Sequence, residues 1–478
     1  MSSTNANRGS LTPVDDKVTT TVSTSNDDAE YATNSAPTSV LPKSRFARWY
    51  RSTLFNVIIV GLISFTQPGI WNALYSVGAG GQQEPYVVNG ASALTFGLMV
   101  FGCSIFGALT NKIGLKPILI MGTLGYAPYS AALYCNTKYG TQWAIFLGAT
   151  TCGIAASALW AAEGAIAVGY PTVKERGLYT GIWLGLRQFG QLIGAAIQLS
   201  INRNESSKGA VNISTYVALI AIQCVGLPLA LLISPPNKAI RSDGTLVLAS
   251  IQKSNVRLEF KRLWHLLKQP QIYFLIPVLV TFMWNSSYQG IYLTKYFSVR
   301  ARTLSSLTSA IGMIIGDLLW GKWLDLSLFG RRNTAKFTWM LFSVIMVGLF
   351  GWQISNEYLY ERASLAATFD WNSPGFGRAY TVNLLFSLMN ESHNIFVYWL
   401  LGTFEMDFEN ITLAVGLMRT FESLGSTLSF AVGSARITPM TNLIISFVVF
   451  AISIPTTMRV TWLVPGSPSD KGPTKANI

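Results

Sequence analysis

A series of apolar segments, each long enough to cross a lipid bilayer as a helix, constrains the fold of this chain more than any other feature. A helix needs about 20 mostly apolar residues to span the hydrocarbon core, and polar connections separate the segments. We predict twelve membrane-spanning helices from this pattern. Their expected ranges are 54–77, 91–110, 117–135, 143–168, 179–200, 214–234, 271–291, 305–324, 336–354, 379–401, 411–433 and 439–457.

The composition excludes the other broad classes of protein. Only 12% of the 478 residues are charged, whereas an average soluble domain carries about 25%. Half of the residues are apolar, which matches twelve spans that together occupy about half of the chain. We therefore predict an all-α, multi-pass membrane protein rather than a soluble enzyme, a disordered chain or a disulfide scaffold.

The twelve spans fall into two groups of six, because the longest predicted cytoplasmic connection follows the sixth span. In that connection Val256, Phe260 and Leu263 recur at helical spacing between basic residues, which indicates an amphipathic helix at the membrane surface. The predicted organisation is a disordered N-terminal tail at 1–50, a bundle at 51–234, a central loop at 235–270, a second bundle at 271–457 and a C-terminal tail at 458–478.

The distribution of basic residues predicts the orientation of the chain. The net charge is +13, and from residue 43 onward one predicted side of the membrane carries 21 Lys and Arg against 9 on the other. Because basic loops stay in the cytoplasm, both termini and the central loop are expected there, in either the plasma membrane or an internal membrane. This placement explains the basic excess without a nucleic-acid partner. Asn204 and Asn212 begin sequons in a predicted external loop, where we expect glycosylation.

Three short motifs occur once in each half of the chain, in the same order. They are W-N-x-x-Y, at Trp71, Asn72 and Tyr75 and at Trp284, Asn285 and Tyr288; R-x-F-x-[QS]-L, from Arg187 and from Arg419; and a basic motif with Gly107, Asn111, Lys112, Gly114 and Lys116 in one copy and Gly321, Asp325, Gly330, Arg331 and Arg332 in the other. Ordered repetition of this kind indicates two related six-helix halves, a plan known for secondary transporters.

The basic motif resembles the cytoplasmic G-x-x-x-D-[RK]-x-G-[RK]-[RK] signature of the major facilitator superfamily. Asp325 occupies the acidic position in the second copy, and Asn111 replaces it in the first. The resemblance implies twelve transmembrane helices in two pseudo-symmetric six-helix bundles, with the motif at a cytoplasmic gate. The W-N-x-x-Y motif and the segments around Glu163 and Arg187 also resemble the uncoordinated-93-like family, including its fungal members, over about residues 50–460. Members of that family are implicated in transport, ion-channel regulation and membrane-protein trafficking.

Ionisable side chains inside predicted spans are costly in a bilayer, so each is a candidate functional residue. They are Glu163, Arg187, Asp317, Glu391, His393, Arg419 and Glu422. Each arginine lies at the same depth in its half and follows a glutamate on the preceding span, which predicts the buried pairs Glu163–Arg187 and Glu391–Arg419. These pairs either fasten neighbouring helices or take part in gating and proton coupling. His393 is either a proton-exchange group, since histidine titrates near neutral pH, or a packed core residue.

The resemblance further implies that spans one, four, seven and ten line a central cavity. The expected substrate contacts are Gln67, Trp71, Asn72, Tyr75, Trp160, Trp284, Asn285, Tyr288 and Asn390, with Glu163, Glu391 and His393 on the same spans. Trp71 and Tyr75 share a helix face because they are four residues apart. Aromatic rings with a few amides suit a small amphiphilic organic solute. Alternatively, the rings only pack against one another near the external surface.

No sequence motif points to enzymatic chemistry. The chain has no G-x-x-x-x-G-K-[ST] loop, no H-E-x-x-H motif and no metal-spaced Cys/His cluster, so we expect no enzyme, no cofactor and no metal site. The predicted function is secondary transport of a small-molecule solute across the lipid bilayer by alternating access, with protons as the candidate coupling ion. The alternative is a scaffold that moves nothing and regulates or escorts another membrane protein or an ion channel.

Overall fold

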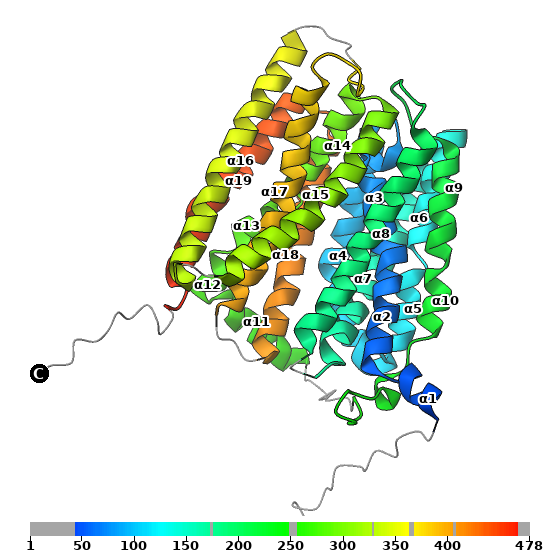
Figure 1. Ribbon diagram of the computed structural model, residues 1–478, viewed down its shortest axis with the longest axis vertical. Helices are drawn as coiled ribbons and strands as arrows, with labels where there is room; N and C mark the ends of the chain where they lie inside the picture. The colour runs from blue at the N-terminus through cyan, green and yellow to red at the C-terminus, as the bar shows by residue number, and fades with distance from the viewer. Residues whose placement is uncertain are drawn as a thin grey trace, which may run out of the picture. The chain divides into compact units, whose positions relative to one another are not determined.

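The computed structural model describes residues 44–172, 175–247, 256–326, 329–362, 368–404 and 408–466. All regular elements in these ranges are helical, apart from three isolated β-bridges (Figure 1). The described residues belong to a single compact unit. The disorder predicted for the N-terminal tail at 1–50 falls largely on residues outside the described ranges, but Arg45–Tyr50 form a short helix, α1, so the prediction was wrong there.

The first half supplies six helical spans. They are α2 (Thr53–Ser64) with η1 (Phe65–Gly69) and α3 (Ile70–Ser76); α4 (Pro85–Ile113); α5 (Leu115–Thr123) with α6 (Tyr126–Tyr139); α7 (Gln142–Gly169); α8 (Arg176–Asn202); and α9 (Ile213–Cys224) with α10 (Gly226–Leu231). The short helix η2 (Ala79–Gly81) follows the first span, and η3 (Pro236–Lys238) begins the central connection.

The second half repeats this number of spans. After α11 (Val256–Leu267) come α12 (Pro270–Tyr273), α13 (Ile276–Thr281) and α14 (Trp284–Tyr296), which form one span; α15 (Val299–Leu326); α16 (Arg331–Arg362); α17 (Phe376–Gly402); α18 (Phe408–Ser434); and α19 (Pro439–Leu463). The twelve spans lie where the apolar segments predicted them, and the helical membrane fold is confirmed.

Length and composition alone identify most of these spans. Among the described residues, eight helical stretches are long and apolar enough to cross a membrane, and a ninth is added if the pair bent by 73° around residues 267–270 counts as one span. The other three are α8, α17 and α18, each 27 residues long. A 27-residue helix is about 40 Å long, so all three are long enough to span the bilayer. They carry Arg187, Glu391 and Arg419, which lower their hydropathy.

The first span is interrupted in its middle, at the level of the charged residues. Pro68 lies inside a π-helical turn, η1, because proline lacks the backbone donor that a regular helix needs. Helix α8 packs directly on this turn at Gly190, where a Cβ atom would collide with the carbonyl oxygen of Phe65. This close approach sets the position of Arg187, which lies one turn earlier on α8.

Buried apolar side chains form one cluster in each half. The first contains residues between Val57 and Val247 together with Val299, and the second contains residues between Leu266 and Val464. The clusters follow the two predicted bundles, although the exact domain boundaries stay a prediction. The amphipathic helix expected in the central connection is present as α11.

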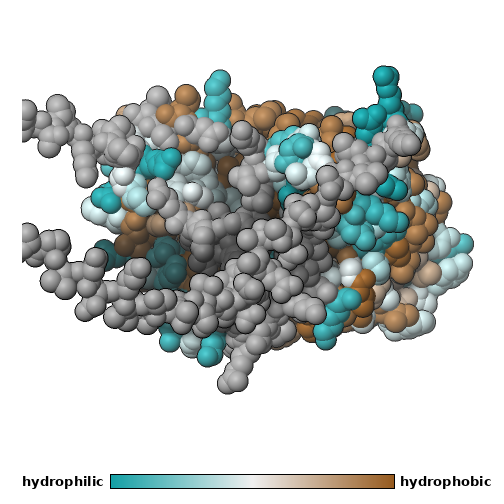
Figure 2. Space-filling model, turned by 90° about the horizontal axis from the view of Figure 1, so that it is seen from below, coloured by the Kyte–Doolittle hydropathy of each residue, from teal (hydrophilic) through white to brown (hydrophobic). Residues whose placement is uncertain are grey.

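Many large apolar side chains face outward, as a lipid-facing surface requires. Phe101 on α4, Leu318 on α15 and Val344 on α16 are all mostly exposed. In the view from the end that carries α1, apolar residues lie along much of the outer flank (Figure 2). The protein is thus suited to a multi-pass position in a bilayer.

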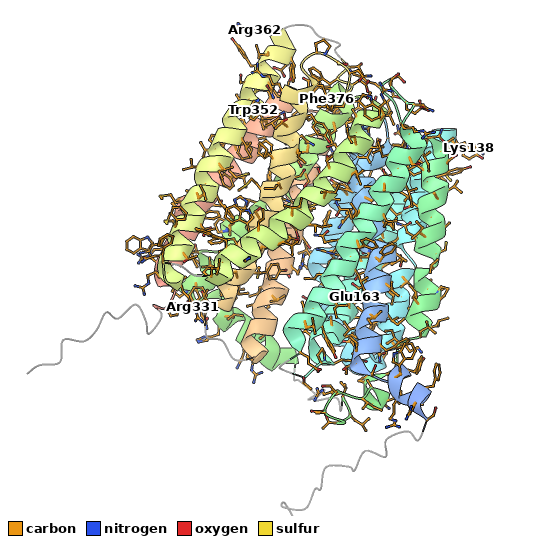
Figure 3. The ribbon with its side chains drawn as sticks, in the orientation of Figure 1. Lys138, Glu163, Arg331, Trp352, Arg362 and Phe376 are labelled. Carbon is orange, nitrogen blue, oxygen red and sulfur yellow. The ribbon has the colours of Figure 1, made fainter. Side chains whose placement is uncertain are left out.

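The two ends of the bundle carry different segments. We call the end with η2 and the first turn of α15 the distal end, and the end with α1 and α11 the tail end (Figure 1). Lys138 and Arg362 lie at the distal end and Arg331 lies at the tail end (Figure 3). The prediction that the tail end is cytoplasmic stays a prediction, as does glycosylation at Asn204 and Asn212.

Candidate functional site

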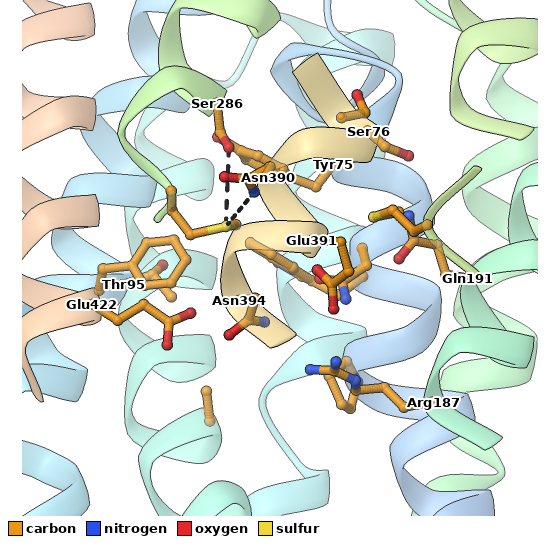
Figure 4. Close-up of a pocket in the computed structure, with 18 of the residues that line it drawn as sticks. Tyr75, Ser76, Thr95, Arg187, Gln191, Ser286, Asn390, Glu391, Asn394 and Glu422 are labelled. Carbon is orange, nitrogen blue, oxygen red and sulfur yellow. Dashed lines mark hydrogen bonds between the residues drawn. The ribbon is translucent and has the colours of Figure 1, made fainter. Parts of the chain in front are cut away.

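A cavity of about 220 Å³ lies between the two halves of the chain. Residues of η1, α3, α4, α7 and α8 line it from the first half, and residues of α14, α15, α17 and α18 line it from the second. Arg187 and Gln191 reach it from α8, and Asn390, Glu391 and Asn394 reach it from α17 (Figure 4). Both halves therefore build this site together.

Five of the predicted substrate contacts line the cavity, and their rings also pack on one another. The five are Trp71, Asn72, Tyr75, Trp160 and Asn390. The rings of Trp71 and Tyr75 stack with centroids 4.9 Å apart and an interplanar angle of 8°. Phe430 on α18 meets the ring of Tyr75 edge-on at 5.5 Å. Aromatic packing and a wall facing the cavity are thus properties of the same side chains.

Three other predicted contacts, Gln67, Trp284 and Asn285, lie outside this cavity. Gln67 is fully buried in the first half, where its Nε2 donates to the carbonyl oxygen of Gln223 at 2.6 Å. Trp284 and Asn285 line a separate pocket of about 30 Å³ inside the second half. The pairing of W-N-x-x-Y motifs therefore does not place equivalent residues in equivalent environments.

The ninth predicted contact, Tyr288, is buried beside a glutamate that the sequence did not single out. Its hydroxyl donates to Glu357 Oε1 at 2.7 Å, and the Tyr296 hydroxyl donates to Glu357 Oε2 at 2.9 Å. Glu357 is fully buried. The predicted ninth span ended at residue 354, whereas α16 continues to Arg362, so this glutamate had been assigned to a loop.

The predicted pair between Glu163 and Arg187 is not formed in the structure. Glu163 is fully buried, and its Oε2 accepts hydrogen bonds from the Ser64 hydroxyl at 2.5 Å and from the Trp183 indole at 3.2 Å. Matching depth on neighbouring helices does not fix the direction of a side chain. Glu163 points to the first span and to the start of α8, while Arg187 lines the cavity.

The second predicted pair is also replaced by another contact. Arg419 forms an ion pair with Glu422, one turn away on the same helix, at 2.9 Å. Glu391 instead faces the first half, where its Oε1 accepts a hydrogen bond from Gln188 Nε2 at 3.4 Å. The indole of Trp160 is near both arginines, 5.5 Å from the Arg187 guanidinium and 4.8 Å from that of Arg419. Glu391 is thus the acidic residue that bridges the halves.

His393 and Asp317 do not line the cavity. His393 is buried among aromatic rings of the second half, 5.0 Å from Phe342 and 5.7 Å from Trp339, and its Nδ1 lies 2.5 Å from the carbonyl oxygen of Met389. This environment favours the packed-core interpretation. Asp317 has a buried Oδ1 without a hydrogen-bond partner and interacts electrostatically with Glu391.

The two copies of the basic motif make equivalent contacts at the tail end. Gly114 and Gly330 have φ angles of +90° and +77°, which glycine adopts without strain. Lys116 Nζ then donates to the carbonyl oxygen of Leu231 at 2.6 Å, at the end of the sixth span. Arg332 Nε donates to that of Val464 at 2.8 Å, at the end of the twelfth.

Several other members of the basic motif lie in more open surroundings. Gly107 and Gly321 have open space beside their Cα atoms, and Arg331 begins α16. Lys112 is exposed near the end of α4. The side chains of Asn111 and Asp325, the acidic position of each copy, lie outside the described residues. A role of this motif as a gate therefore stays a prediction.

A buried arginine at the distal end joins the two halves. Arg302 is only 1% exposed, and from α15 it donates to four backbone carbonyl groups of the first half. The acceptors are Val77 and Gly78 at 2.9 and 2.8 Å, Gly209 at 2.8 Å and Gln82 at 3.1 Å. Sequence reasoning missed this residue because it lies just before the predicted eighth span and its partners are backbone groups.

Further hydrogen bonds between the halves surround Arg302. The hydroxyls of Ser76 and Ser306 lie 2.5 Å apart, and the backbone amide of Val299 donates to the carbonyl oxygen of Ser207 at 2.9 Å. Arg302 and these neighbours form what we call the distal seal. It closes the interface between the halves beyond the cavity.

Next to the distal seal, an ion pair holds the loop before α17. Arg300 Nε donates to Asp370 Oδ1 at 2.7 Å, and the Ser298 hydroxyl donates to the same oxygen at 2.7 Å. The Arg300 guanidinium beside Asp370 holds the pKa of that carboxyl below its usual range. This pair lies within the second half.

Comparison with known proteins identifies the family. The model of the family described as Major Facilitator Superfamily matches residues 52–430. The chain belongs to this superfamily. The solved structure of a D-xylose-proton symporter shares the fold of this superfamily member, with a TM-score of 0.59, 11% identity, and coverage of 87% of this chain and 98% of that one.

The superfamily member also has sequence relatives in fungi and plants. It is 34% identical to "Notoamide biosynthesis cluster protein O'" of Aspergillus versicolor, over 81% of this chain and 83% of the relative. It is 28% identical to an UNC93-like protein of Schizosaccharomyces pombe, over 81% and 78%, and 27% identical to UNC93-like protein 1 of Arabidopsis thaliana, over 86% and 91%. The UNC93-like resemblance seen in the sequence is confirmed.

Proposed function

We propose that this protein is a secondary transporter that moves a small amphiphilic organic solute by alternating access. The observation that carries the proposal is the cavity of about 220 Å³ that both halves line, with the distal seal on one side of it. A solute-sized cavity at the interface of two repeats is where rocking of one repeat against the other exposes a site to either side in turn. The cavity favours transport over the scaffold alternative.

The lining supports an amphiphilic solute. The stacked rings of Trp71 and Tyr75 offer an apolar wall, and the amides of Asn72, Asn390 and Gln191 offer hydrogen-bonding groups. A mostly apolar site with a few convergent polar groups is typical of small-molecule recognition. With the termini in the cytoplasm, as the basic residues predict, the distal seal closes the external side.

We propose protons as the coupling ion, with Glu391 as the exchange group. Glu391 lines the cavity and bonds across the halves to Gln188, so its charge bears on their contact. The charged and titratable groups that face it are Arg187 on α8, Asp317 on α15, Tyr398 on α17, and Arg419 and Glu422 on α18. Protonation of Glu391 changes the balance of charge among these groups, which is what a coupled step requires.

The experiment begins with cells that contain or lack the protein, in which an untargeted comparison of solutes taken up and released identifies the cargo. Trp71→Ala is expected to abolish cargo flux at unchanged protein abundance, and Trp143→Ala, on the exposed end of α7, is the matched control that keeps it. If no flux depends on the protein while the location of another membrane protein does, the scaffold function stands instead.

Coupling is tested by flux against pH in two glutamate variants, normalised to the protein at the surface. Glu391→Gln is expected to leave a folded protein whose flux no longer depends on pH. Glu163→Gln, whose side chain is sealed between Ser64 and Trp183, is expected to keep the pH dependence of the molecules that fold. An unchanged pH profile in Glu391→Gln would remove protons from this site.

A further inference from the structure

In the part of the chain that the structure describes, Arg187 is a basic side chain of the cavity that contacts no carboxylate directly. Among the described residues, no carboxylate forms an ion pair with Arg187, and its buried Nε has no hydrogen-bond partner. Its guanidinium lies 5.5 Å from the Trp160 ring and lines the cavity. Glu391 and Asp317 interact electrostatically with Arg187 but form no ion pair with it, and a charge that is only partly compensated inside a membrane protein is costly. Arg187 therefore lacks a partner that a bound molecule can provide.

The other arginine that lines the cavity, Arg419, has its charge neutralised by an ion pair within the protein. Arg419 lies 4.8 Å from the Trp160 ring and is paired with Glu422 at 2.9 Å. The two arginines share one aromatic ring, yet among the described residues only Arg419 forms an ion pair with a carboxylate. This difference indicates that Arg187, and not Arg419, is available to bind an anionic group of the solute.

We propose that the solute carries a singly charged anionic group, such as a carboxylate, that binds Arg187, while its apolar body lies against Trp71 and Tyr75. This inference rests on the proposed function and names the class of its substrate. A guanidinium presents two parallel donors that match a carboxylate. A doubly charged phosphate needs a second free cation, and Arg419 is already neutralised by Glu422.

The position of Glu391 explains how the site avoids a permanent internal pair. Its carboxylate and Arg187 both face the cavity (Figure 4). Glu391 also accepts a hydrogen bond from Gln188, the residue next to Arg187. An anion that binds Arg187 meets this carboxylate close by, which disfavours binding while Glu391 is charged. Protonation of Glu391 therefore strengthens binding of a solute anion, and a bound anion in turn favours protonation of Glu391. A cationic solute would be repelled by the charge of Arg187.

The test compares three probes of the same shape and different charge: 3-phenylpropionate, 3-phenylpropanol and 3-phenylpropylamine. Each is titrated at pH 7 into the full-length protein purified in detergent, and the midpoint of thermal unfolding is recorded. We expect 3-phenylpropionate to stabilise the protein at a concentration at least about tenfold below that of the alcohol, because it adds a charge-assisted hydrogen bond to Arg187. The amine should be the weakest.

Variants show whether Arg187 is responsible. Arg187→Gln should remove the preference for 3-phenylpropionate, and Arg187→Lys should keep part of it, since the charge remains without the paired donors. Arg203→Gln is the matched control, because Arg203 is an exposed cation at the other end of α8. Each variant is compared with its own unliganded midpoint, so a loss of basal stability does not affect the result.

The outcomes separate this inference from the proposed function. Equal stabilisation by the alcohol, preference for the amine, or an unchanged preference in Arg187→Gln would overturn the anion assignment and leave a solute cavity. If none of the three probes stabilises the protein and liposomes containing it move none of them, the amphiphilic-solute function is overturned as well.

Discussion

In the first half, Lys116 follows a left-handed glycine and donates to a carbonyl group at the end of the sixth span. In the second half, Arg332 does the same at the end of the twelfth span. The halves therefore repeat each other at the tail end. They differ in the middle of the membrane, where Glu163 is sealed by Ser64 and Trp183 but Glu391 opens onto the cavity.

The distal end differs between the halves as well. The motif offset between Gly107 and Gly321 is 214 residues, so the first-half counterpart of Arg302 is Val88. Val88 is an apolar residue buried in the first-half core, whereas Arg302 reaches across to the other half. The comparison teaches that the two halves share their contacts at the tail end, while each half has its own polar groups where the halves meet.

The largest effect is expected from breaking the distal seal. Arg302→Ala removes hydrogen bonds from a charged donor to four carbonyl groups. Since a hydrogen bond of a charged group contributes about 1.5–3 kcal/mol, losing even two of them shifts the equilibrium toward a distal-open state by at least about a hundredfold. The measurement is labelling of an introduced Ser76→Cys by an impermeant thiol reagent, which should rise.

Arg300→Ala provides the control for that experiment. It lies two residues away on the same helix but is paired with Asp370 inside the second half. Labelling at position 76 should be unchanged in this variant. Equal labelling in both variants would mean that Arg302 stabilises the fold rather than the closed state.

The next largest effect sharpens the contrast between the two glutamates. Glu163→Ala removes the acceptor of two hydrogen bonds at a fully buried site, so the free energy of unfolding should fall by about 3 kcal/mol. Glu391→Ala should lower it by less than about 1 kcal/mol, because that carboxylate faces the cavity and accepts one long bond. Thermal unfolding of both purified variants measures the difference, and similar losses would contradict it.

The sequence was informative wherever hydropathy or a repeated motif decided the structure. The twelve spans follow from the length of the apolar segments and α11 follows from apolar periodicity, whereas the break at Pro68 was not predicted. Depth along a helix could be read from residue numbers, so the arginines were assigned to the same level. The rotation of each helix about its axis could not be read in this way. That rotation decides that Glu163 accepts a hydrogen bond from Trp183 rather than pairing with Arg187.

Other features left no readable pattern. Arg302 binds backbone carbonyl groups, which every residue has, so no partner residue marks the contact. His393 occupied a span expected to line the cavity, yet it lies among aromatic rings because α17 presents it to the second-half core. Glu357 was hidden because α16 continues eight residues beyond the end of its predicted apolar segment.

A smaller and equal pair of effects tests the repeated part of the structure. Lys116→Ala and Arg332→Ala each remove a cation from the carbonyl end of a span, an interaction of about 0.3–1 kcal/mol. Both variants should lower the midpoint of thermal unfolding slightly and by the same amount. A much larger loss in one half would show that the two contacts are not equivalent.

The smallest effect concerns the two distal loops, which are held by different chemistry. In the first half, the neutral side chain of Gln82 donates to Tyr216 at 2.7 Å and accepts from Asn136 at 2.9 Å. In the second half, Arg300 and Asp370 carry opposite charges. Acid should therefore loosen only the second loop, which hydrogen exchange at the start of α17 would detect against exchange at the start of α4.

The direction of this pH effect follows from the pKa of Asp370. Arg300 lowers that pKa, so the folded state favours the ionised carboxyl. The stabilisation is present above the unfolded value of about 3.9 and is lost as the pH falls through the lower folded value. Because both side chains of this pair remain partly exposed, solvent and salt screen it, so the effect is small and should shrink at high ionic strength. Asp370→Asn should abolish the acid response, whereas loosening of the Gln82 loop over the same pH range would contradict the comparison.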